Sequence, residues 1–122
     1  MKKVLIIESS PRKGGNSNLL CDEFARGATE SGNAVKRIAL RDKNIRFCKA
    51  CYACFKTGRC VQKDDMEEIL NEFQAADVVV LASPVYFRAI NGQMKTMIDR
   101  LLPRWQDLSV KESRGQPKNG AL

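Results

Sequence analysis

The chain has 122 residues, of which 43% are apolar and 29% charged, and its formal net charge is +7. This length predicts one domain over residues 1–122, and the composition is that of a globular protein rather than a disordered one. The chain contains no histidine, which excludes catalytic triads and metal sites that depend on imidazole. No apolar run approaches the roughly 18 residues that a membrane-spanning helix needs.

The positive charge is scattered, without a block of five or more basic residues. Three interpretations stay open: a solvated surface, steering of an anionic cofactor, and nucleic-acid binding. We expect the first, and therefore no nucleic-acid partner. The N-terminal apolar run ends at Glu8, which is too short for a signal peptide. We therefore expect a cytoplasmic protein that does not associate with a membrane.

The N-terminal third predicts a strand, a helix and a second strand. Residues 3–8 form a continuous apolar run, as in a strand buried on both faces of a parallel sheet. Asn16 or Ser17 is expected to cap the helix that follows, and Gly32 to end it. The expected buried stripe of that helix repeats every four residues, at Leu20, Phe24 and Ala28. Residues 34–40 are the second strand candidate.

The remainder predicts a long loop over residues 41–63, followed by a helix, a strand and a helix. Asp64 and Glu67 have the spacing of a capping box. The buried stripe of the helix that they begin is expected at Met66, Ile69, Leu70 and Phe73. Residues 77–81 are the third strand candidate, and Pro103 is expected to end the helical stripe that follows. We expect a loop over residues 106–119 and the start of another strand at residues 120–122.

This order of elements predicts an α/β fold with an open parallel sheet and helices on both faces. Ligands of such sheets bind beside the carboxyl ends of the strands. Two polar or aromatic segments follow strands and would meet at that edge: residues 9–18, the first loop, and residues 83–87, the second loop.

The first loop is rich in Ser, Asn and Gly and contains Arg12. It matches neither the dinucleotide nor the nucleoside-triphosphate glycine pattern. Hydroxyls, backbone amides and a helix start suit a single phosphate, and Arg12 adds a charged contact. The alternative is a polar turn that only caps a helix.

The second loop carries Tyr86 and Phe87 directly after an apolar strand. Exposed backbone amides and aromatic side chains at this place suit a flat heteroaromatic ring. The alternative is that the two aromatic side chains pack beneath the next helix. A phosphate loop and a ring-binding loop at one sheet edge together predict a flavin mononucleotide (FMN) site.

Four of the five cysteines lie close together, at positions 48, 51, 54 and 60. Without a secretion signal a disulfide framework is not expected, so the group indicates metal binding or redox chemistry. The fifth, Cys21, is expected to be a small core residue of the first helix.

Three motifs in order resemble those of one known family. They are E-S-S-P-R-K-G-G-N-S-N, the cysteine run that ends in G-R-C-V-Q-K-D-D-M, and S-P-V-Y-F followed by N-G-Q-M-K-T-M-I-D-R. The chain resembles the flavodoxin-like NAD(P)H-dependent FMN reductases, and among them the iron–sulfur flavoproteins. The resemblance implies a flavodoxin-like fold with non-covalent FMN and no catalytic acid–base side chain.

The resemblance also implies roles for individual residues. The phosphate would be held by residues of the first loop: Ser10, Arg12, Asn16, Ser17 and Asn18. The isoalloxazine ring would be bordered by the second loop: Ser83, Pro84, Val85, Tyr86 and Phe87. Lys95, Asp99 and Arg100 belong to the family's helix pattern, and we interpret them as an exposed helix face with structural ion pairs.

The spacing C-x2-C-x2-C-x5-C is similar to the compact cysteine pattern of the iron–sulfur subgroup. It implies that Cys48, Cys51, Cys54 and Cys60 bind a [4Fe–4S] cluster, each thiolate holding one iron. Zinc, which four thiolates also bind, and thiols without a metal stay open as alternatives.

The activity implied is transfer of a hydride from NAD(P)H to FMN. Electrons would then pass to a quinone, a free flavin or a redox protein, with or without the cluster. The alternatives are a flavodoxin-type electron carrier without nicotinamide turnover and a non-enzymatic metal- or thiol-binding module. Family members continue through two more strands and helices, so we expect a flavodoxin-like domain that is incomplete near its fourth strand. We also expect a homo-oligomer, because an uncovered sheet edge favours association.

Overall fold

The computed structural model describes residues 1–103, and its centre is a three-stranded parallel sheet. The strands are β1 (Lys3–Glu8), β2 (Ala34–Ala39) and β3 (Val78–Ala82), in the order β2-β1-β3. β1 pairs with both neighbours along its length. The expected α/β fold is thus confirmed in its strands, although β3 begins and ends one residue later than expected.

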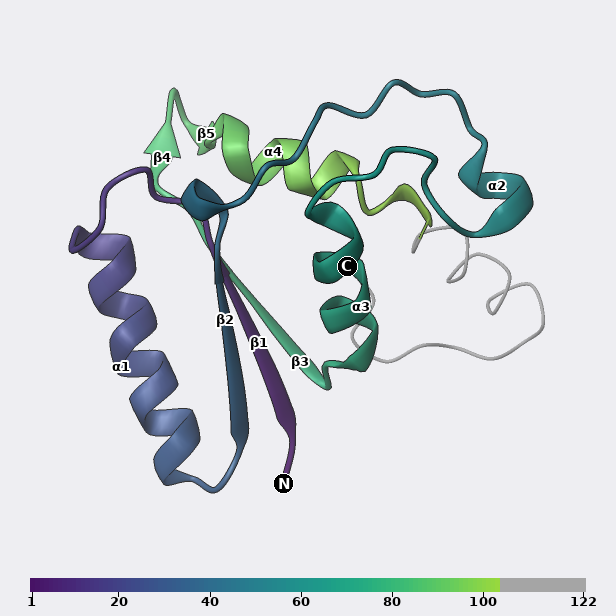
Figure 1. Ribbon diagram of the computed structural model, residues 1–122. Coiled ribbons are helices and arrows are strands. Elements are labelled where there is room, and N and C mark those ends of the chain that lie inside the picture. Colours follow the sequence, from purple (N-terminus) through teal and green to yellow (C-terminus); the bar gives the residue numbers. More distant parts are fainter. Residues whose placement is uncertain (104–122) are drawn as a thin grey trace.

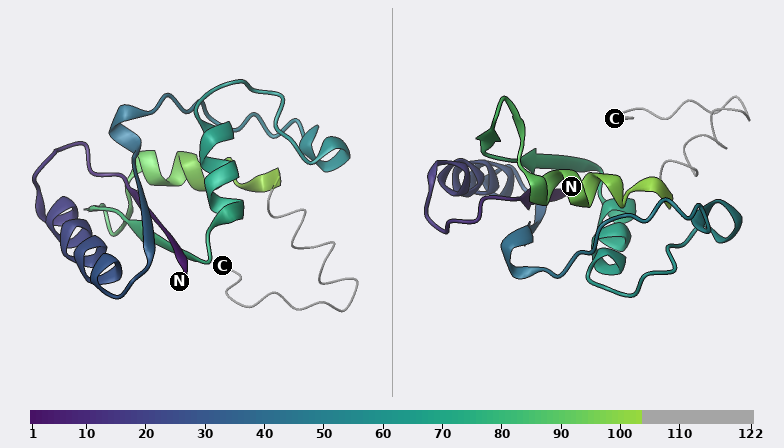
Figure 2. Two further views of the ribbon diagram at one scale, coloured as in Figure 1. Left: turned by 60° about the horizontal axis from the view of Figure 1, so that its bottom comes forward. Right: turned by 90° about the horizontal axis from the view of Figure 1, so that it is seen from above.

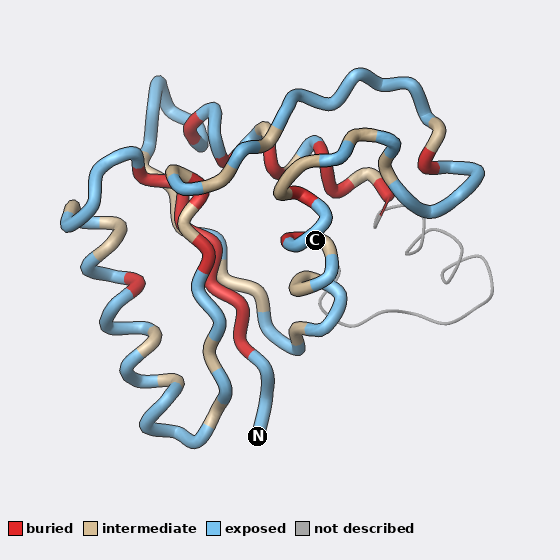
Figure 3. Tube along the Cα trace, in the orientation of Figure 1, coloured by how far each residue is buried: buried red, intermediate tan, exposed pale blue. Residues whose placement is uncertain are grey.

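β1 is the most deeply buried element of the sheet. Val4 through Glu8 are all buried, and Figure 3 shows this run crossing the middle of the molecule. Successive side chains of a strand point to opposite faces, so a strand covered on both faces has no polar alternation. This is why the apolar run predicted β1 at its observed bounds.

One face of the sheet is covered by α1 (Asn16–Glu30), seen beside β2 in Figure 1. The helix residues that pack on Val4 and Ile6 are small: Cys21, Ala25 and Ala28. The expected stripe was therefore wrong in two of its members, since Leu20 is 71% exposed and Phe24 46% exposed. Small side chains let the helix approach the sheet closely, and the large ones point outward.

Of the two predicted ends of α1, the C-terminal one is confirmed and the N-terminal one is wrong. Gly32 adopts a left-handed φ of +86° just after the helix, as expected for a terminating glycine. The expected cap at Asn16 or Ser17 was wrong. Gly15 is the N-cap residue, and no side chain caps the helix.

The other face is covered by α3 (Met66–Ala75) and α4 (Gly92–Asp99). Both helices pack on the second set of β1 side chains, Leu5 and Ile7, and complete the larger of two cores. The expected stripe of α3 is confirmed, with Met66 and Ile69 fully buried and Leu70 and Phe73 packed against them. Helices on both faces of the sheet are therefore confirmed as well (Figures 1 and 2).

The expected capping box at Asp64 was wrong. The N-cap residue of α3 is Asp65, with no side-chain cap bond. The Asp64 carboxylate does accept the Met66 amide at 3.1 Å. Its other oxygen accepts from Arg100, the residue just after α4, at 2.8 Å, so this side chain joins the start of α3 to the end of α4 rather than closing a box with Glu67.

The chain between β2 and α3 lies at the carboxyl end of the sheet and then extends away from it (Figures 1 and 2). It contains a 3-10 turn, η1 (Leu40–Asp42), and a single helical turn, α2 (Cys54–Thr57). Residues 48–60, the cysteine segment, form the outer part of this excursion.

Two short strands follow β3: β4 (Val85–Tyr86) and β5 (Ala89–Ile90), paired antiparallel. The turn between them places Phe87 and Arg88 at positive φ of 47° and 66°. Such two-residue turns normally use Asn-Gly or Asp-Gly, so the sequence did not indicate a hairpin here.

The loop expected at residues 106–119 and the strand start at residues 120–122 lie outside the described residues. The single domain over residues 1–122 stays a prediction. Within residues 1–103, no helix has the length and apolar character needed to cross a membrane.

Candidate functional site

The first and second loops meet at the carboxyl edge of the sheet. The Ser9 amide donates to the Ala82 carbonyl at 3.0 Å, which joins the ends of β1 and β3. Asn91 Nδ2 donates to the Ser9 carbonyl at 2.7 Å, and the Asn91 amide donates to Ser83 Oγ at 3.0 Å. Ser83 Oγ also donates to Asn91 Oδ1 at 3.3 Å, so one buried residue holds both loops.

Asn91 also begins α4, since its Oδ1 accepts the Met94 amide at 3.1 Å. Sequence reasoning missed this residue. The available signal was an asparagine directly before a helical stripe, which is typical of an N-cap.

The first loop ends in an uncapped helix start. The first helical hydrogen bond of α1 runs from the Leu19 amide to the Gly15 carbonyl at 3.0 Å. The amides of Asn16, Ser17 and Asn18 precede it and have no carbonyl within the helix to bond. Gly14 turns the chain into this end at a φ of +83°. Free amides at a positive helix end are what an anion requires.

Two of the five expected phosphate residues shape the loop itself. Ser10 Oγ donates to the Arg12 carbonyl at 3.0 Å and accepts the Arg12 amide at 3.2 Å. Asn18 Oδ1 accepts the Gly14 amide at 3.2 Å. The Arg12 and Asn16 side chains are exposed and Ser17 is half-buried, so these three are the ones free to contact a ligand.

The Glu8 carboxylate stabilises the first loop through its hydrogen bond with Asn18. It is buried, and it accepts hydrogen bonds from Asn18 at 2.8 Å, Arg37 at 2.7 Å and Arg41 at 3.0 Å. Burial raises the pKa of this carboxyl, but the hydrogen bonds from the two arginines and Asn18 outweigh it and lower the pKa overall. Sequence reasoning missed this network, although a lone carboxylate closing a buried apolar run was a signal.

The second loop presents its aromatic side chains outward. Ser83 and Pro84 are half-buried, whereas Val85, Tyr86 and Phe87 are exposed, Phe87 completely. The alternative that the aromatic residues pack beneath the next helix was therefore wrong. Left-handed backbone at a bulky residue costs roughly 1–2 kcal/mol, and such strain persists mainly at functional sites.

The four thiols of the cysteine segment lie near one another but do not converge on one point. Cys54 is buried, Cys60 half-buried, and Cys48 and Cys51 exposed, and no disulfide joins them. Burial raises the pKa of the Cys54 thiol, and the nearby Cys60, Cys48 and Cys51 raise it further. Within residues 1–103, no group of three or more His, Cys, Asp and Glu side chains is close enough together to hold a metal ion.

The donor atoms of this segment are nevertheless of the type that binds an iron–sulfur cluster, because cysteine thiolates are the usual ligands of such clusters. The Ala50 amide donates to Cys48 Sγ and the Gln62 amide to Cys60 Sγ, both at 3.4 Å. Hydrogen bonds to sulfur are one of the means by which proteins tune such clusters. Ala50 also adopts a left-handed φ of 54°, which turns the chain sharply between the first two cysteines.

Lys95, Asp99 and Arg100 do not share one exposed face as expected. Lys95 and Asp99 do form an exposed ion pair. Arg100 is only 2% exposed and pairs with Asp64. The expectation was wrong for Arg100.

Comparisons with known proteins connect this geometry to a family. Residues 2–114 match the model of the family described as NADPH-dependent FMN reductase. An iron–sulfur flavoprotein of Archaeoglobus fulgidus is 43% identical over 94% of this chain and 52% of its own length. One from Methanosarcina thermophila is 34% identical over 93% of this chain and 60% of its own length. The chain thus spans about half the length of these relatives.

Solved structures confirm the fold. An NAD(P)H:quinone oxidoreductase from Methanothermobacter marburgensis superposes with a TM-score of 0.67 at 17% identity, over 82% of this chain and 52% of that one. An FMN-dependent NADH-azoreductase from Bacillus anthracis, in complex with FMN, gives 0.60 at 21% identity, over 80% and 54%. The fold is flavodoxin-like, iron–sulfur flavoproteins are among the relatives that the chain resembles, and the chain belongs to the NADPH-dependent FMN reductase family.

Proposed function

We propose that this chain binds FMN across the first and second loops and acts as an NAD(P)H-dependent oxidoreductase. The observation that carries the proposal is the meeting of an uncapped helix start and an exposed aromatic hairpin at one sheet edge, where Asn91 holds them together. Family membership supports the same cofactor.

The FMN phosphate would lie at the start of α1. The amides of Asn16 and Ser17, the Ser17 hydroxyl and the Arg12 guanidinium would contact it, and Ser10 and Asn18 would keep the loop in shape. The isoalloxazine would lie against residues 83–87, with backbone amides at its polar edge and Tyr86 or Phe87 at its face. When bound, FMN supplies the redox chemistry, since a flavin accepts a hydride and releases electrons singly.

We further propose that Cys48, Cys51, Cys54 and Cys60 hold a [4Fe–4S] cluster. Four thiolates in one segment are a sufficient ligand set, two of the sulfur atoms already accept backbone amides, and the relatives carry the name iron–sulfur flavoprotein. Zinc would use the same ligands, and iron and zinc analysis separates the two.

Reduced nicotinamide dinucleotide would be the electron donor, and a quinone, a free flavin or a redox protein the acceptor. A flavodoxin-type carrier is the alternative, and it would not oxidise NADH or NADPH. We also propose a homo-oligomer, because α1 leaves Leu19, Leu20 and Phe24 exposed. Thiols without disulfides favour a reducing compartment such as the cytoplasm.

The test is a fluorescence titration of FMN into the apoprotein, comparing wild type with Arg12→Ala/Ser17→Ala. Losing one charged and one neutral hydrogen bond should weaken binding by about 2–3 kcal/mol, which is about 30- to 150-fold in Kd. The matched control is Arg26→Ala/Ser31→Ala, which removes the same residue types from exposed positions on α1 and directly after it. Equal affinities for the two double variants would contradict the assignment of the first loop.

A further inference from the structure

A cavity of about 610 Å³, which we call the α3 cavity, lies between the end of the cysteine segment and α3. Its volume is in the range of small-molecule sites. No described residue of the first or second loop lines it, so it is separate from the proposed FMN site. Its charged lining is mostly basic: among the described residues it contains Lys56, Arg59, Lys63 and Arg100 but a single acid, Glu67. The α3 cavity therefore favours an anionic ligand.

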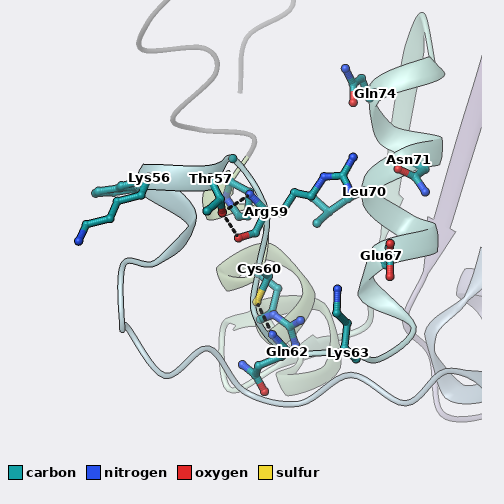
Figure 4. A pocket seen from close by; sticks show the side chains of 14 residues that line it. Lys56, Thr57, Arg59, Cys60, Gln62, Lys63, Glu67, Leu70, Asn71 and Gln74 are labelled. Carbon is teal, nitrogen blue, oxygen red and sulfur yellow. Dashed lines mark hydrogen bonds between the residues drawn. The ribbon is translucent and has the colours of Figure 1, made fainter.

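Two of these cations are available to a ligand. Figure 4 shows that the side chains of Arg59 and Lys63 reach into the space in front of α3, whereas Lys56 points away from it. Neither of the two forms a side-chain hydrogen bond or ion pair among the described residues. Arg100 is already paired with Asp64, so the unbalanced charge is that of Arg59 and Lys63. An arginine and a lysine beside each other are typical of phosphate recognition, the first as a fork and the second as a point charge.

The wall also holds two polar atoms without partners. Arg100 is 2% exposed, and its Nε has no acceptor among the described residues. Gln62 Oε1 is buried and has no donor there. Buried polar atoms nearly always have a partner, so both atoms indicate a ligand that can donate and accept. On the α3 side, Asn71 and Gln74 contribute amide groups, the side chains that bind the edge of adenine.

The backbone that carries Arg59 and Lys63 is held by contacts that involve no cysteine. Thr57 Oγ1 accepts the Arg59 amide at 3.2 Å and donates to the Arg59 carbonyl at 3.0 Å. The Arg46 guanidinium donates to the Lys63 carbonyl at 2.8 Å, and the Arg46 amide donates to Asp64 Oδ2 at 2.9 Å. Both cations therefore start from fixed positions, which lowers the cost of ordering them around a ligand.

We propose that the α3 cavity binds a phosphorylated adenine nucleotide. The phosphate lies between Arg59 and Lys63, and the base lies against the amide groups of Asn71 and Gln74. Two sources share this chemistry: a free nucleotide, and the adenosine half of NADPH, which carries one phosphate more than NADH.

The second source rests on the proposed function. The α3 cavity and the proposed flavin loops lie at opposite ends of α4, because Arg100 follows its last residue and Asn91 caps its first turn. The chain rises about 14 Å from Asn91 to Arg100 at 1.5 Å per residue. A nicotinamide dinucleotide has its two bases at opposite ends of two riboses and a pyrophosphate, which is the shape needed to contact both places.

The test is a calorimetric titration of adenosine 2′,5′-bisphosphate, the phosphorylated adenosine half of NADPH, into the full chain. The cavity variant is Arg59→Ala/Lys63→Ala. The matched control is Arg26→Ala/Lys49→Ala, which removes the same residue types and the same charge from exposed positions that do not line the α3 cavity. Adenosine without phosphate is titrated in parallel, and KM is measured for NADPH and for NADH.

We expect wild type and the control variant to bind the bisphosphate alike, and the cavity variant to bind it about tenfold more weakly or worse, because two charged contacts are lost. Adenosine should bind all three proteins equally. A KM that rises for NADPH but not for NADH in the cavity variant would identify the dinucleotide as the source. Unchanged KM values together with weakened binding of the bisphosphate would identify a free nucleotide.

Two results would overturn the inference: wild type that does not bind the bisphosphate, or a cavity variant that binds it as tightly as the control variant. A chain that oxidises neither NADPH nor NADH would contradict the proposed function instead. The calorimetric comparison of the two double variants would then still decide whether the α3 cavity is a nucleotide site.

Discussion

Replacing Asn91 with alanine tests whether one side chain joins the two loops. The Asn91 side chain makes three hydrogen bonds, to the Met94 amide, the Ser83 hydroxyl and the Ser9 carbonyl, and it is fully buried. Losing the helix cap costs about 1 kcal/mol. Leaving the buried Ser9 carbonyl without this donor costs a further ~1–3 kcal/mol. We expect Asn91→Ala to lower the free energy of unfolding by about 3 kcal/mol.

A serine at this position separates the two contributions. Asn91→Ser keeps a cap acceptor but is too short to reach the Ser9 carbonyl, so it should lose only about 2 kcal/mol. Both variants should also bind FMN about tenfold more weakly, because the loops are no longer ordered before binding.

The assays are urea unfolding and FMN titration. Asn71→Ala is the control, since Asn71 is exposed on α3 and its replacement should change stability by no more than about 0.5 kcal/mol. An Asn91→Ala protein as stable as Asn71→Ala would show that the Asn91 side chain does not hold the two loops together.

Three further predictions concern the buried charges and the strained hairpin. Arg100 and two backbone amides outweigh burial and hold the pKa of Asp64 at about 2 instead of 3.8. A pKa that is lower in the folded protein adds stability at pH values above the pKa of the unfolded chain. About 2 kcal/mol of the free energy of unfolding should therefore be lost as pH falls from 4 to 2. Urea unfolding of Asp64→Asn should not show this loss. Glu8→Gln leaves Arg37 and Arg41 without their carboxylate and should destabilise by ~1–3 kcal/mol in thermal unfolding. Glu23→Gln on the exposed face of α1 should change stability by less than about 0.5 kcal/mol, and equal effects would contradict the role of Glu8. Phe87→Gly relieves a left-handed residue and should raise stability by about 1 kcal/mol while weakening FMN binding. Arg88→Gly should give the same gain without the binding loss, and unchanged FMN affinity in Phe87→Gly would argue against a ring contact.

The apolar pattern predicted an element correctly where both faces of a strand, or the large side chains of a helix, are buried. β1 has no polar alternation because helices cover both its faces, so its apolar run predicted its bounds. The stripe of α3 was predicted because its large residues point into the core. The same rule failed on α1, where Cys21, Ala25 and Ala28 face the sheet and Leu20 faces outward. The spacing of apolar residues predicts that a helix has a buried and an exposed face. It does not predict that a helix packed closely on a sheet will bury the face with small side chains.

The candidate site was predictable as two loops but not as one connected structure. Ser, Gly and Asn after a strand indicated an anion site. The contacts that join distant parts are pairings across the fold, which no local pattern records. They are Asn91 to Ser9, Glu8 to Arg37 and Arg41, and Arg100 to Asp64. The Phe87–Arg88 turn was missed because its residues contradict the usual preference for glycine and asparagine.

The central claim is that one chain holds a flavin at the sheet edge and a cluster at the cysteine segment. The most direct test is an absorption spectrum of protein purified without oxygen, with flavin and iron counted on the same sample. We expect one FMN per chain and a structured flavin band over a broad absorption from about four irons. A colourless protein that does not take up added FMN would contradict it.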